Sequence, residues 1–398
     1  MSAARTCRHG TALVEKTDAY KVVADLLRLR LWAVEALSTG RPDIRTVDVI
    51  PREIWFRFLA LERCAGPILE KVSIDLIPEP AQGIVRSAAA VEAQSALTAQ
   101  AEGRQIAKIA QEAGFPVVVL KGGVNAVAGK RPMLALVDID LLVDQSHVKS
   151  LVGRLEKAGF GRPARELDHH QGLKPATDRL AVEVHWTTHD DGTPLDPLLW
   201  NRVRPIVEVP PLKRLSTHDH LEHLLEHAIV VHRERSVSLR DVIIVGNAAR
   251  ECTDGELAQV RERIQNHEQR EPMVQLLDFA LAVSEGHTAK DPFIESCAIF
   301  YSGVVLAPFL PKAFASSGAL AFILEMELGR ISRTDAMRNA LKWRGTGQKH
   351  LNAIAERFPS IGKGIFGPSH LAYYGTVAAA VLPSIRSTRT QALSELGL

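Results

Sequence analysis

The sequence is poor in the residues that mark several common protein classes. Cysteine occurs four times, at scattered positions and never in a Cys-x-x-Cys spacing, which argues against a disulfide framework and against a cysteine-rich zinc site. Aromatic residues make up 5% of the chain, and the formal net charge is only +2. The molecule as a whole therefore does not attract nucleic acid or anionic membranes by its charge, and any basic recognition surface must be local.

Long hydrophobic runs are also missing. The longest apolar stretch, near Cys297–Leu310, is interrupted by Ser302 and Pro308 and is shorter than the roughly 20 residues that span a bilayer. The first ten residues are charged and contain no apolar core of the kind found in signal peptides. The sequence therefore predicts a cytoplasmic protein with no membrane and no disulfide partner, and a buried helix near Cys297.

Helical periodicity dominates both ends of the chain. Apolar residues recur at helical spacing in Tyr20–Leu37, and an Ala- and Gln-rich helix is predicted over residues 81–113, with Gly114 as its left-handed cap. Beyond residue 210 the pattern predicts helices at residues 221–231, 256–266 and 272–283, the last of them opened by Pro272.

The middle of the chain has a different pattern. Short apolar runs predict strands at Val117–Leu120, Val137–Val143 and Val182–Trp186, with a helix at Ser146–Ala158 that has Ser146 as its cap. We therefore expect an α+β, mostly helical protein with a small mixed-sheet core. The expected divisions are an N-terminal helical region (1–81), the α/β core (82–200) and a C-terminal helical domain (201–398).

Two aspartates are set into the second predicted strand. Residues two apart on a strand share a face, so Asp138 and Asp140 point the same way, while Ile139 and Leu141 point into a core. Two like charges buried without partners destabilise a fold, so replacing one should not lower stability. Mg²⁺ suits such a pair because it takes a few oxygen ligands and completes its shell with nucleotide phosphates. The alternative is a solvent-facing strand edge with two acids of no special role.

The third predicted strand repeats this design. Glu183 and His185 share one face, and Val182 and Val184 share the other. If this strand neighbours the Asp-x-Asp strand, Glu183 completes a three-carboxylate cluster that can hold two metal ions; otherwise it is a surface glutamate. His185 is a candidate for binding a phosphate or substrate, or for a hydrogen bond within the site.

A Lys-Gly-Gly turn follows the first predicted strand and leads into a helix. Glycines at such a turn let backbone N–H groups approach phosphate oxygens, so Lys121, Gly122 and Gly123 are candidates for nucleotide binding. Lys121 either neutralises phosphate charge or ends the strand in solvent. The segment Gly123–Lys130 is not a P-loop, because its spacing is one residue too long and Arg131 stands where Ser or Thr is required.

The order of these motifs resembles the nucleotidyltransferase superfamily of polymerase-β-like fold, in which a Gly-Gly or Gly-Ser turn precedes Asp-x-Asp and a third carboxylate. Within it, Leu120–Gly122, Asp138–Val143 and Glu183–Trp186 are most similar to the uncharacterised bacterial nucleotidyltransferase family. A later histidine-containing helix, similar to Leu221–His232, is also typical of that family. The resemblance covers about residues 88–245. It departs from the family in one respect, since the arginine that commonly precedes the first aspartate lies further upstream here, as Arg131.

This resemblance implies a metal-dependent nucleotidyltransferase. Its catalytic and metal-binding residues would be Asp138, Asp140 and Glu183, with two Mg²⁺ ions and Mn²⁺ as the alternative. The enzyme would transfer a nucleoside monophosphate from an NTP, by in-line attack at the α-phosphate, to an unidentified acceptor that is a small molecule, a peptide or RNA. The alternatives are a non-catalytic nucleotide- or partner-binding protein of the same fold and a toxin-type transferase that acts on tRNA.

Two further features have ordinary structural explanations. The segment His223–His227 matches the inverted zinc motif His-x-x-Glu-His, although histidines on helices are usually structural or exposed. The segment Arg330–Lys363 holds eight Lys or Arg residues against Asp335 and Glu356. Such a stretch is typical either of a surface for an anionic acceptor such as RNA or of a solvated helix face.

Overall fold

The chain folds into two compact units. The computed structural model describes residues 18–131, 134–166, 169–175, 179–188, 195–231, 236–288, 290–307 and 369–398. One unit takes in the described residues of 1–30, 232–237 and 292–398, and the other takes in those of 31–231 and 238–291. The division into regions 1–81, 82–200 and 201–398 stays a prediction.

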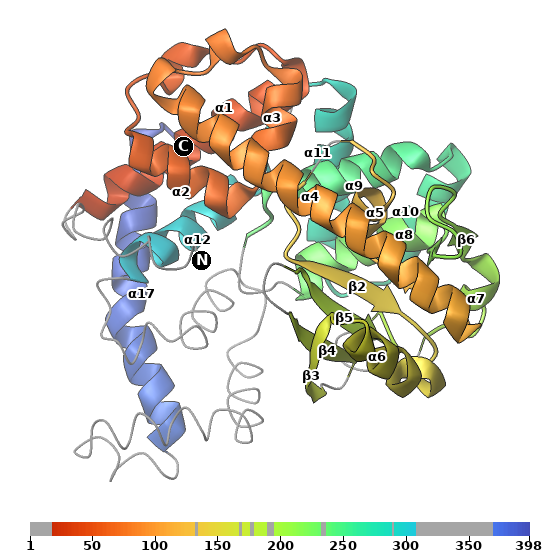
Figure 1. Cartoon of the computed structure of the whole chain (residues 1–398). Helices are drawn as coiled ribbons and strands as arrows, with labels where there is room; N and C mark the ends of the chain where they lie inside the picture. The colour runs from red at the N-terminus through yellow and green to blue at the C-terminus, as the bar shows by residue number, and fades with distance from the viewer. Residues whose placement is uncertain are drawn as a thin grey trace. The chain divides into compact units, whose positions relative to one another are not determined.

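Helices make up most of the larger unit (Figure 1). They are α2 (Arg52–Glu62), α3 (Ala65–Lys71), α4 (Glu79–Ala113), α5 (Gly123–Val127), α6 (Val148–Lys157), α7 (Leu199–Arg202), α8 (Thr217–Glu226), the π-helical turn η6 (His227–Val231), α9 (Leu239–Glu251), α10 (Asp254–Gln265) and α11 (Arg270–Glu285). Short 3-10 turns lie at η3 (Ile44–Thr46), η4 (Ile74–Leu76) and η5 (Gln145–His147), and α1 (Ala19–Thr39) crosses the boundary between the units. The helices predicted at residues 20–37, 81–113, 221–231, 256–266 and 272–283 are thereby confirmed.

Two predicted helix starts are wrong by a few residues. Helix α6 begins at Val148, after the turn η5, and its N-cap residue His147 makes no side-chain capping bond. Asp144 caps η5 instead, accepting a hydrogen bond of 2.9 Å from the backbone N–H of Ser146, so Ser146 lies inside that turn and is not the cap. Helix α11 begins at Arg270, which places Pro272 within the first turn, where its missing N–H costs nothing.

Seven strands form one mixed sheet in the order β3-β4-β5-β2-β1-β7-β6. They are β1 (Val118–Val119), β2 (Asp138–Leu142), β3 (Gly161–Glu166), β4 (His170–Pro175), β5 (Ala181–His185), β6 (Arg204–Pro205) and β7 (Lys213–Arg214). Strand β2 is parallel to β5 and antiparallel to β1, and β4 pairs antiparallel with β5. The three predicted strands are β1, β2 and β5, and the predicted class, α+β and mostly helical with a small mixed sheet, is confirmed.

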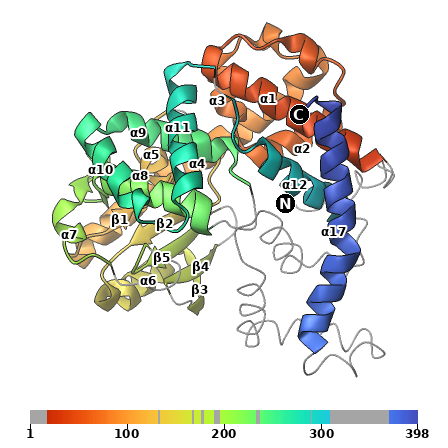
Figure 2. The ribbon, with the colours of Figure 1, turned by 180° about the vertical axis from the view of Figure 1, so that it is seen from behind.

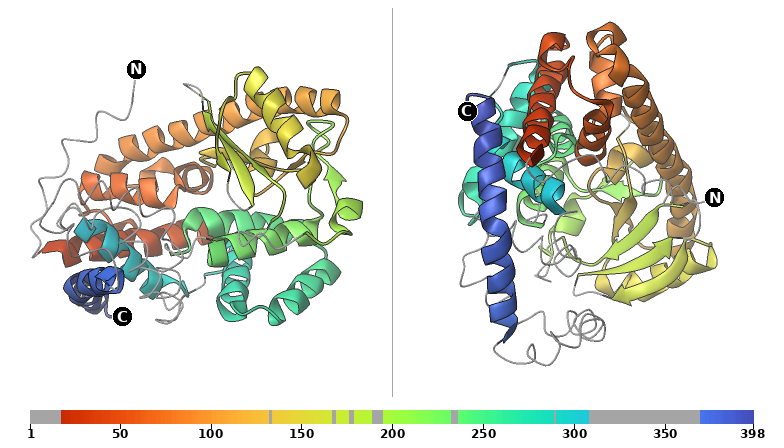
Figure 3. Two further views of the ribbon diagram at one scale, coloured as in Figure 1. Left: turned by 90° about the horizontal axis from the view of Figure 1, so that it is seen from below. Right: turned by 90° about the vertical axis from the view of Figure 1, so that its left-hand side faces the viewer.

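One face of the sheet forms the main core of the larger unit. The buried side chains of Ile139, Leu141, Val182 and Val184 pack there with residues of α4 and α6. Figure 3 (left) shows these two helices on one side of the sheet and the green segment that contains α8 and α9 on the other. Because side chains alternate along a strand, the polar residues of β2 and β5 belong to the face that α4 and α6 do not cover.

Helix α4 is the scaffold for the turn that follows β1. It ends at Gly114, whose φ of +75° is the left-handed conformation predicted for the cap. Within the helix, a Cβ on Gly103 would lie 2.7 Å from the Cβ of Val127, so only glycine lets α5 pack this closely against α4. This contact fixes α5 and, with it, the Lys-Gly-Gly turn that leads into it.

The hairpin of β3 and β4 was not predicted, because it lacks the apolar alternation of a half-buried strand. Leu173 is the residue of the pair that enters the core cluster. The hairpin depends instead on backbone pairing and on Gly161, which has a φ of +132° and on which a Cβ would overlap the carbonyl oxygen of Lys174. Backbone pairing does not depend on side-chain type, so the sequence pattern does not reveal it.

The smaller unit contains α12 (Ile294–Leu306) and α17 (Ser369–Glu395), which pack against each other (Figure 2). Helix α12 confirms the buried helix predicted near Cys297. An ion pair of 2.9 Å between Arg28 and Glu395 joins α17 to the start of α1. Among the described residues, no helix has the length and apolar character needed to cross a membrane. The basic stretch at residues 330–363 lies outside the described residues.

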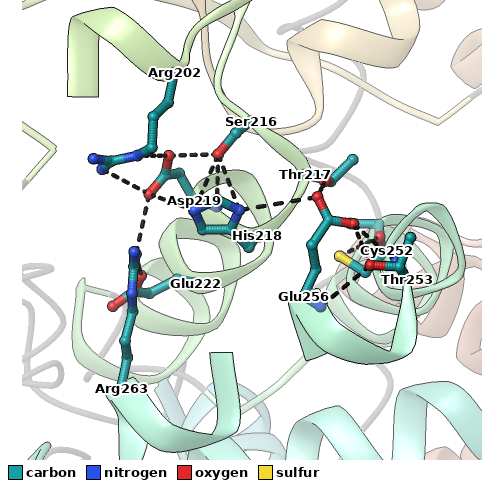
Figure 4. A network of polar contacts seen from close by, with 11 residues as sticks. Arg202, Ser216, Thr217, His218, Asp219, Glu222, Cys252, Thr253, Glu256 and Arg263 are labelled. Carbon is teal, nitrogen blue, oxygen red and sulfur yellow. Dashed lines mark hydrogen bonds and ion pairs between the residues drawn. The ribbon is translucent and has the colours of Figure 1, made fainter. Parts of the chain in front are cut away.

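A polar network around Asp219 ties α8 to α7 and α10 (Figure 4). The buried Asp219 carboxylate accepts hydrogen bonds of 2.9 and 3.1 Å from Arg202 and of 3.0 Å from Arg263. The Ser216 hydroxyl also donates to it. Burial by itself would raise the pKa of Asp219, but these donors lower that pKa to about 2.

We expect this network to make the fold sensitive to acid. A carboxyl whose pKa is lower in the folded state stabilises the protein above its unfolded pKa, and this contribution disappears as the pH falls towards 2. Asp219→Asn should lower the free energy of unfolding by about 1–2 kcal/mol near pH 5 and by much less near pH 2.5. Urea unfolding at both pH values measures this; Asp278→Asn, which breaks an exposed pair with Arg261, is the control. A difference that did not change with pH would contradict the prediction.

Candidate active site

Strands β2 and β5 bring two of the predicted acids together. They run parallel as direct neighbours, with Asp140 opposite Glu183, Leu142 opposite His185 and Asp138 opposite Ala181. Side chains of directly opposed residues lie on the same face of a sheet. The condition for a carboxylate cluster, that the two strands are neighbours, is therefore met, and Glu183 lies beside Asp140.

Asp140, Glu183 and His185 form a compact group of possible metal ligands. Each offers one ligand atom, and these atoms lie within 4.8 Å of one another. Nε2 of His185 is 3.0 Å from Oδ1 of Asp140 and 3.5 Å from Oε2 of Glu183. Asp138 lies two residues away on the same strand, half-buried, and is not part of this close group. Asp140 and Glu183 thus form a close pair, and Asp138 supplies a third carboxylate from the same face of β2.

Lys121 belongs to this site through an ion pair with Asp140. Its Nζ lies 3.0 Å from Oδ1 of Asp140, and its side chain is 19% exposed, so it does not end the strand in open solvent. Its φ of +53° is unusual for a residue with a side chain, and it turns the chain sharply at the end of β1. Asp140 therefore has a partner of opposite charge within the protein, through a long-range pairing that the sequence does not show.

The charges of the site shift its pKa values in different directions. Burial would raise the pKa of Asp140, but Lys121 and His185 hold it well below its ordinary value. For Asp138, burial and then the neighbouring Asp140 raise the pKa, and Lys121 and Arg240 only partly offset this. A hydrogen bond from His185 lowers the pKa of Glu183. Asp138 is thus the acid whose charge is least favoured, and Asp140 is held ionised.

The Lys-Gly-Gly turn packs against α9. Gly122 has ordinary helical angles, with φ −64° and ψ −16°, so glycine is favoured there by limited space rather than by conformation. A Cβ there would lie 3.2 Å from Nη2 of Arg240 and 3.3 Å from Cδ1 of Ile244, and one on Gly123 would lie 3.1 Å from Cγ1 of Val119. Glycine at these positions is therefore explained by packing, and a role in phosphate binding stays a prediction.

Arg240 is a residue of this region that sequence analysis missed. Its Nε donates a hydrogen bond of 3.1 Å to the backbone carbonyl of Ala135, just before β2. Its guanidinium thereby lies beside the turn at Gly122 and close enough to Asp138 to influence it. An arginine on an amphipathic helix gives no sequence signal, because it looks like any solvated residue.

Histidines from β4 and α8 surround the acids. The ring of His170 lies 4.9 Å from that of His185 and 4.4 Å from that of His169, centre to centre. His223 is buried on α8, and among the described residues neither of its ring nitrogens has a hydrogen-bond partner. Burial, and then the charge of Lys121, place the pKa of His223 well below its ordinary value. No group of possible metal ligands in the described part of the chain includes His223 or His227, so the inverted zinc motif gains no support.

Comparison with solved structures gives distant likenesses. A CCA-adding enzyme in complex with ATP is 13% identical, with 74% of this chain and 82% of that chain covered and a TM-score of 0.22. A tRNA-processing enzyme complex is 12% identical, with 73% and 88% covered and a TM-score of 0.24. At these scores the likenesses say nothing about the function of this chain. A comparison with curated proteins gives no match.

A comparison with models of protein families gives a match over residues 56–283. The family is described as uncharacterised nucleotidyltransferase. The matched segment is more than half of the chain and contains Lys121, both aspartates of β2, Glu183 and His185. From this match, and in agreement with the motifs of its sequence, the chain belongs to the uncharacterised nucleotidyltransferase family.

Proposed function

We propose that this enzyme transfers a nucleoside monophosphate from an NTP to an acceptor, with Mg²⁺ held by Asp138, Asp140 and Glu183. The observation that carries the proposal is the direct pairing of Asp140 with Glu183 on β2 and β5. Their oxygens belong to a group that spans no more than 4.8 Å, which fits a small divalent cation with oxygen ligands at about 2.1 Å. Asp138, on the same strand face, would hold a second ion.

The bound ions would neutralise the charge of the triphosphate and lower the pKa of the attacking hydroxyl. The protein's own groups prepare the site for this. Lys121 keeps Asp140 ionised and fixes its side chain, so that the ligand is already in its reactive form. Arg240, beside the Lys-Gly-Gly turn, would contact the phosphates as negative charge builds up in the in-line displacement.

The proposal is tested by incubating the full chain with each labelled NTP and Mg²⁺. Three acceptor pools are compared: small metabolites, proteins and total RNA. We expect label to be transferred to a component of one pool, with release of pyrophosphate, and no transfer without the divalent cation. If each pool stays unlabelled although the NTP binds, the proposal is wrong and a binding protein of the same fold remains. Transfer to RNA that weakens steeply with salt would favour the tRNA-directed alternative.

Glu183→Gln should weaken Mg²⁺ binding and lower turnover by about 10²-fold, with a smaller effect on NTP binding. The amide oxygen keeps the shape of the side chain and can still accept the hydrogen bond from His185, but the negative charge of a metal ligand is lost. Initial rates as a function of Mg²⁺ concentration measure the effect. Glu156→Gln, on the exposed face of α6, is the matched control. An unchanged Mg²⁺ dependence would remove Glu183 from the site.

Arg240→Gln should raise the KM for NTP by about 10- to 10²-fold, which corresponds to the loss of one charged hydrogen bond. The turnover number should fall less, because the carboxylates stay in place. Arg250→Gln is the control, since Arg250 lies on the same helix but is exposed and donates a hydrogen bond of 2.7 Å to Asn247 of that helix. If both variants had the KM of the wild type, the triphosphate would not lie near α9.

A further inference from the structure

A second group of possible metal ligands lies beside the carboxylates, and it is made of nitrogen. His169, His170 and His185 each offer a ring nitrogen, and the three nitrogens lie within 4.8 Å of one another. In a tetrahedral site with Zn–N bonds of 2.0–2.1 Å, the ligand nitrogens are about 3.4 Å apart. Small rotations of the side chains are enough to close this difference.

The backbone holds these histidines together. His170 begins β4 and stands directly opposite His185 on the antiparallel neighbour β5, so the two side chains share a face. The carbonyl oxygen of His169 accepts a hydrogen bond of 3.2 Å from the backbone N–H of Trp186, which fixes the residue just before β4. The imidazoles of His170 and His185 therefore converge from paired strands, and the backbone hydrogen bond of His169 holds that residue next to them, as in a preorganised ligand set.

The state of His170 points to a missing partner. Its Nδ1 is buried and makes no hydrogen bond within the part of the chain that the structure describes. Its Nε2 is 3.7 Å from Oε1 of Glu183, which is longer than a hydrogen bond. A buried polar atom without a partner destabilises the fold, and a metal ion bound to this nitrogen would remove that cost.

We propose that His169, His170 and His185 bind a Zn²⁺ ion. Imidazole nitrogens favour zinc and other borderline transition cations, whereas Mg²⁺ prefers oxygen. His185 belongs to both ligand groups, so the zinc site overlaps the site of Asp140 and Glu183. Zinc bound there engages a residue that contacts both Asp140 and Glu183, and it places a second positive charge beside the Mg²⁺ ligands. Zinc therefore inhibits nucleotide transfer. This last step rests on the proposed function; zinc binding does not.

The test is the binding of Zn²⁺ to the metal-free full chain without nucleotide, by calorimetry in the presence of excess Mg²⁺. We expect Zn²⁺ to bind despite the excess of Mg²⁺. His169→Ala and His170→Ala should each weaken binding by about 10²-fold or more, because removal of a ligand costs at least as much as removal of a residue that only orients one. His287→Ala is the control, because the side chain of His287 is 72% exposed and distant in the chain. Melting curves show that each variant is folded.

Co²⁺ gives a second readout, because its visible spectrum reports the nitrogen ligands directly. The band of Co²⁺ in the wild type should disappear in His169→Ala and in His170→Ala. Equal zinc affinity in these variants and in the wild type would overturn the site. Zinc binding without inhibition of transfer would overturn the regulatory role. Zinc binding is measured without nucleotide. A failure of the proposed transfer activity can therefore be told apart from a failure of the zinc site.

Discussion

Asp138→Asn should abolish nucleotide transfer and leave the thermal stability unchanged or slightly raised. The loss of rate should be about 10³-fold or more, or about 4 kcal/mol of transition-state stabilisation, because a charged metal ligand is removed. Stability should not fall, since burial and the neighbouring Asp140 raise the pKa of Asp138 and thus disfavour its charged form. A neutral amide relieves that repulsion.

Turnover with saturating NTP and melting without metal measure the two parts of this prediction. Asp144→Asn is the matched control, because this aspartate lies just beyond the same strand, is exposed and acts as a cap that asparagine can replace. A variant at position 138 with near-normal turnover would show that Asp138 holds no essential ion. A clear fall in melting temperature would show that its charge has a stabilising partner.

Asp140→Asn should abolish transfer to the same degree but also destabilise the fold by roughly 3 kcal/mol. Its carboxylate is 5% exposed and pairs with Lys121 at 3.0 Å, so its loss leaves a mostly buried ammonium without its hydrogen-bonded partner and with only the more distant charges of Asp138 and Glu183. Removing one partner of a buried pair is far more costly than removing both. The two aspartates of one strand should therefore have opposite effects on stability.

The double variant Lys121→Met/Asp140→Asn separates the two roles of Asp140. It should recover most of the lost free energy of unfolding, because the buried ammonium of Lys121 is removed together with its partner, but it should remain inactive. Urea unfolding of the wild type, Lys121→Met, Asp140→Asn and the double variant gives the coupling energy between the two residues. If Asp140→Asn alone melted like the wild type, the Lys121–Asp140 pair would not stabilise the fold. If the double variant were active, Asp140 would not be a metal ligand.

The sequence by itself determined which side chains share a face. Alternation along a strand is a local property, so Ile139 and Leu141 on one side require Asp138 and Asp140 on the other, and β2 has that arrangement. The same holds for Val182 and Val184 against Glu183 and His185. The long helix up to Gly114 followed in the same way, from helical spacing and from a glycine that can adopt a positive φ.

Only the tertiary structure decided what stands next to these side chains. The pairing of Asp140 with Glu183 joins residues far apart in the chain, and its register depends on the parallel contact of β2 with β5. Lys121 comes from a turn that the sequence marks only as a candidate for nucleotide binding, and its pairing with Asp140 is a tertiary contact. Arg240 and His170 come from a helix and a hairpin whose own sequences carry no signal of the site. The balance of charge around Asp140 follows from these long-range contacts, because distance and burial, rather than residue type, set the strength of an electrostatic interaction. For that reason the sequence predicted where the acids point, and the fold decided which of them is paired.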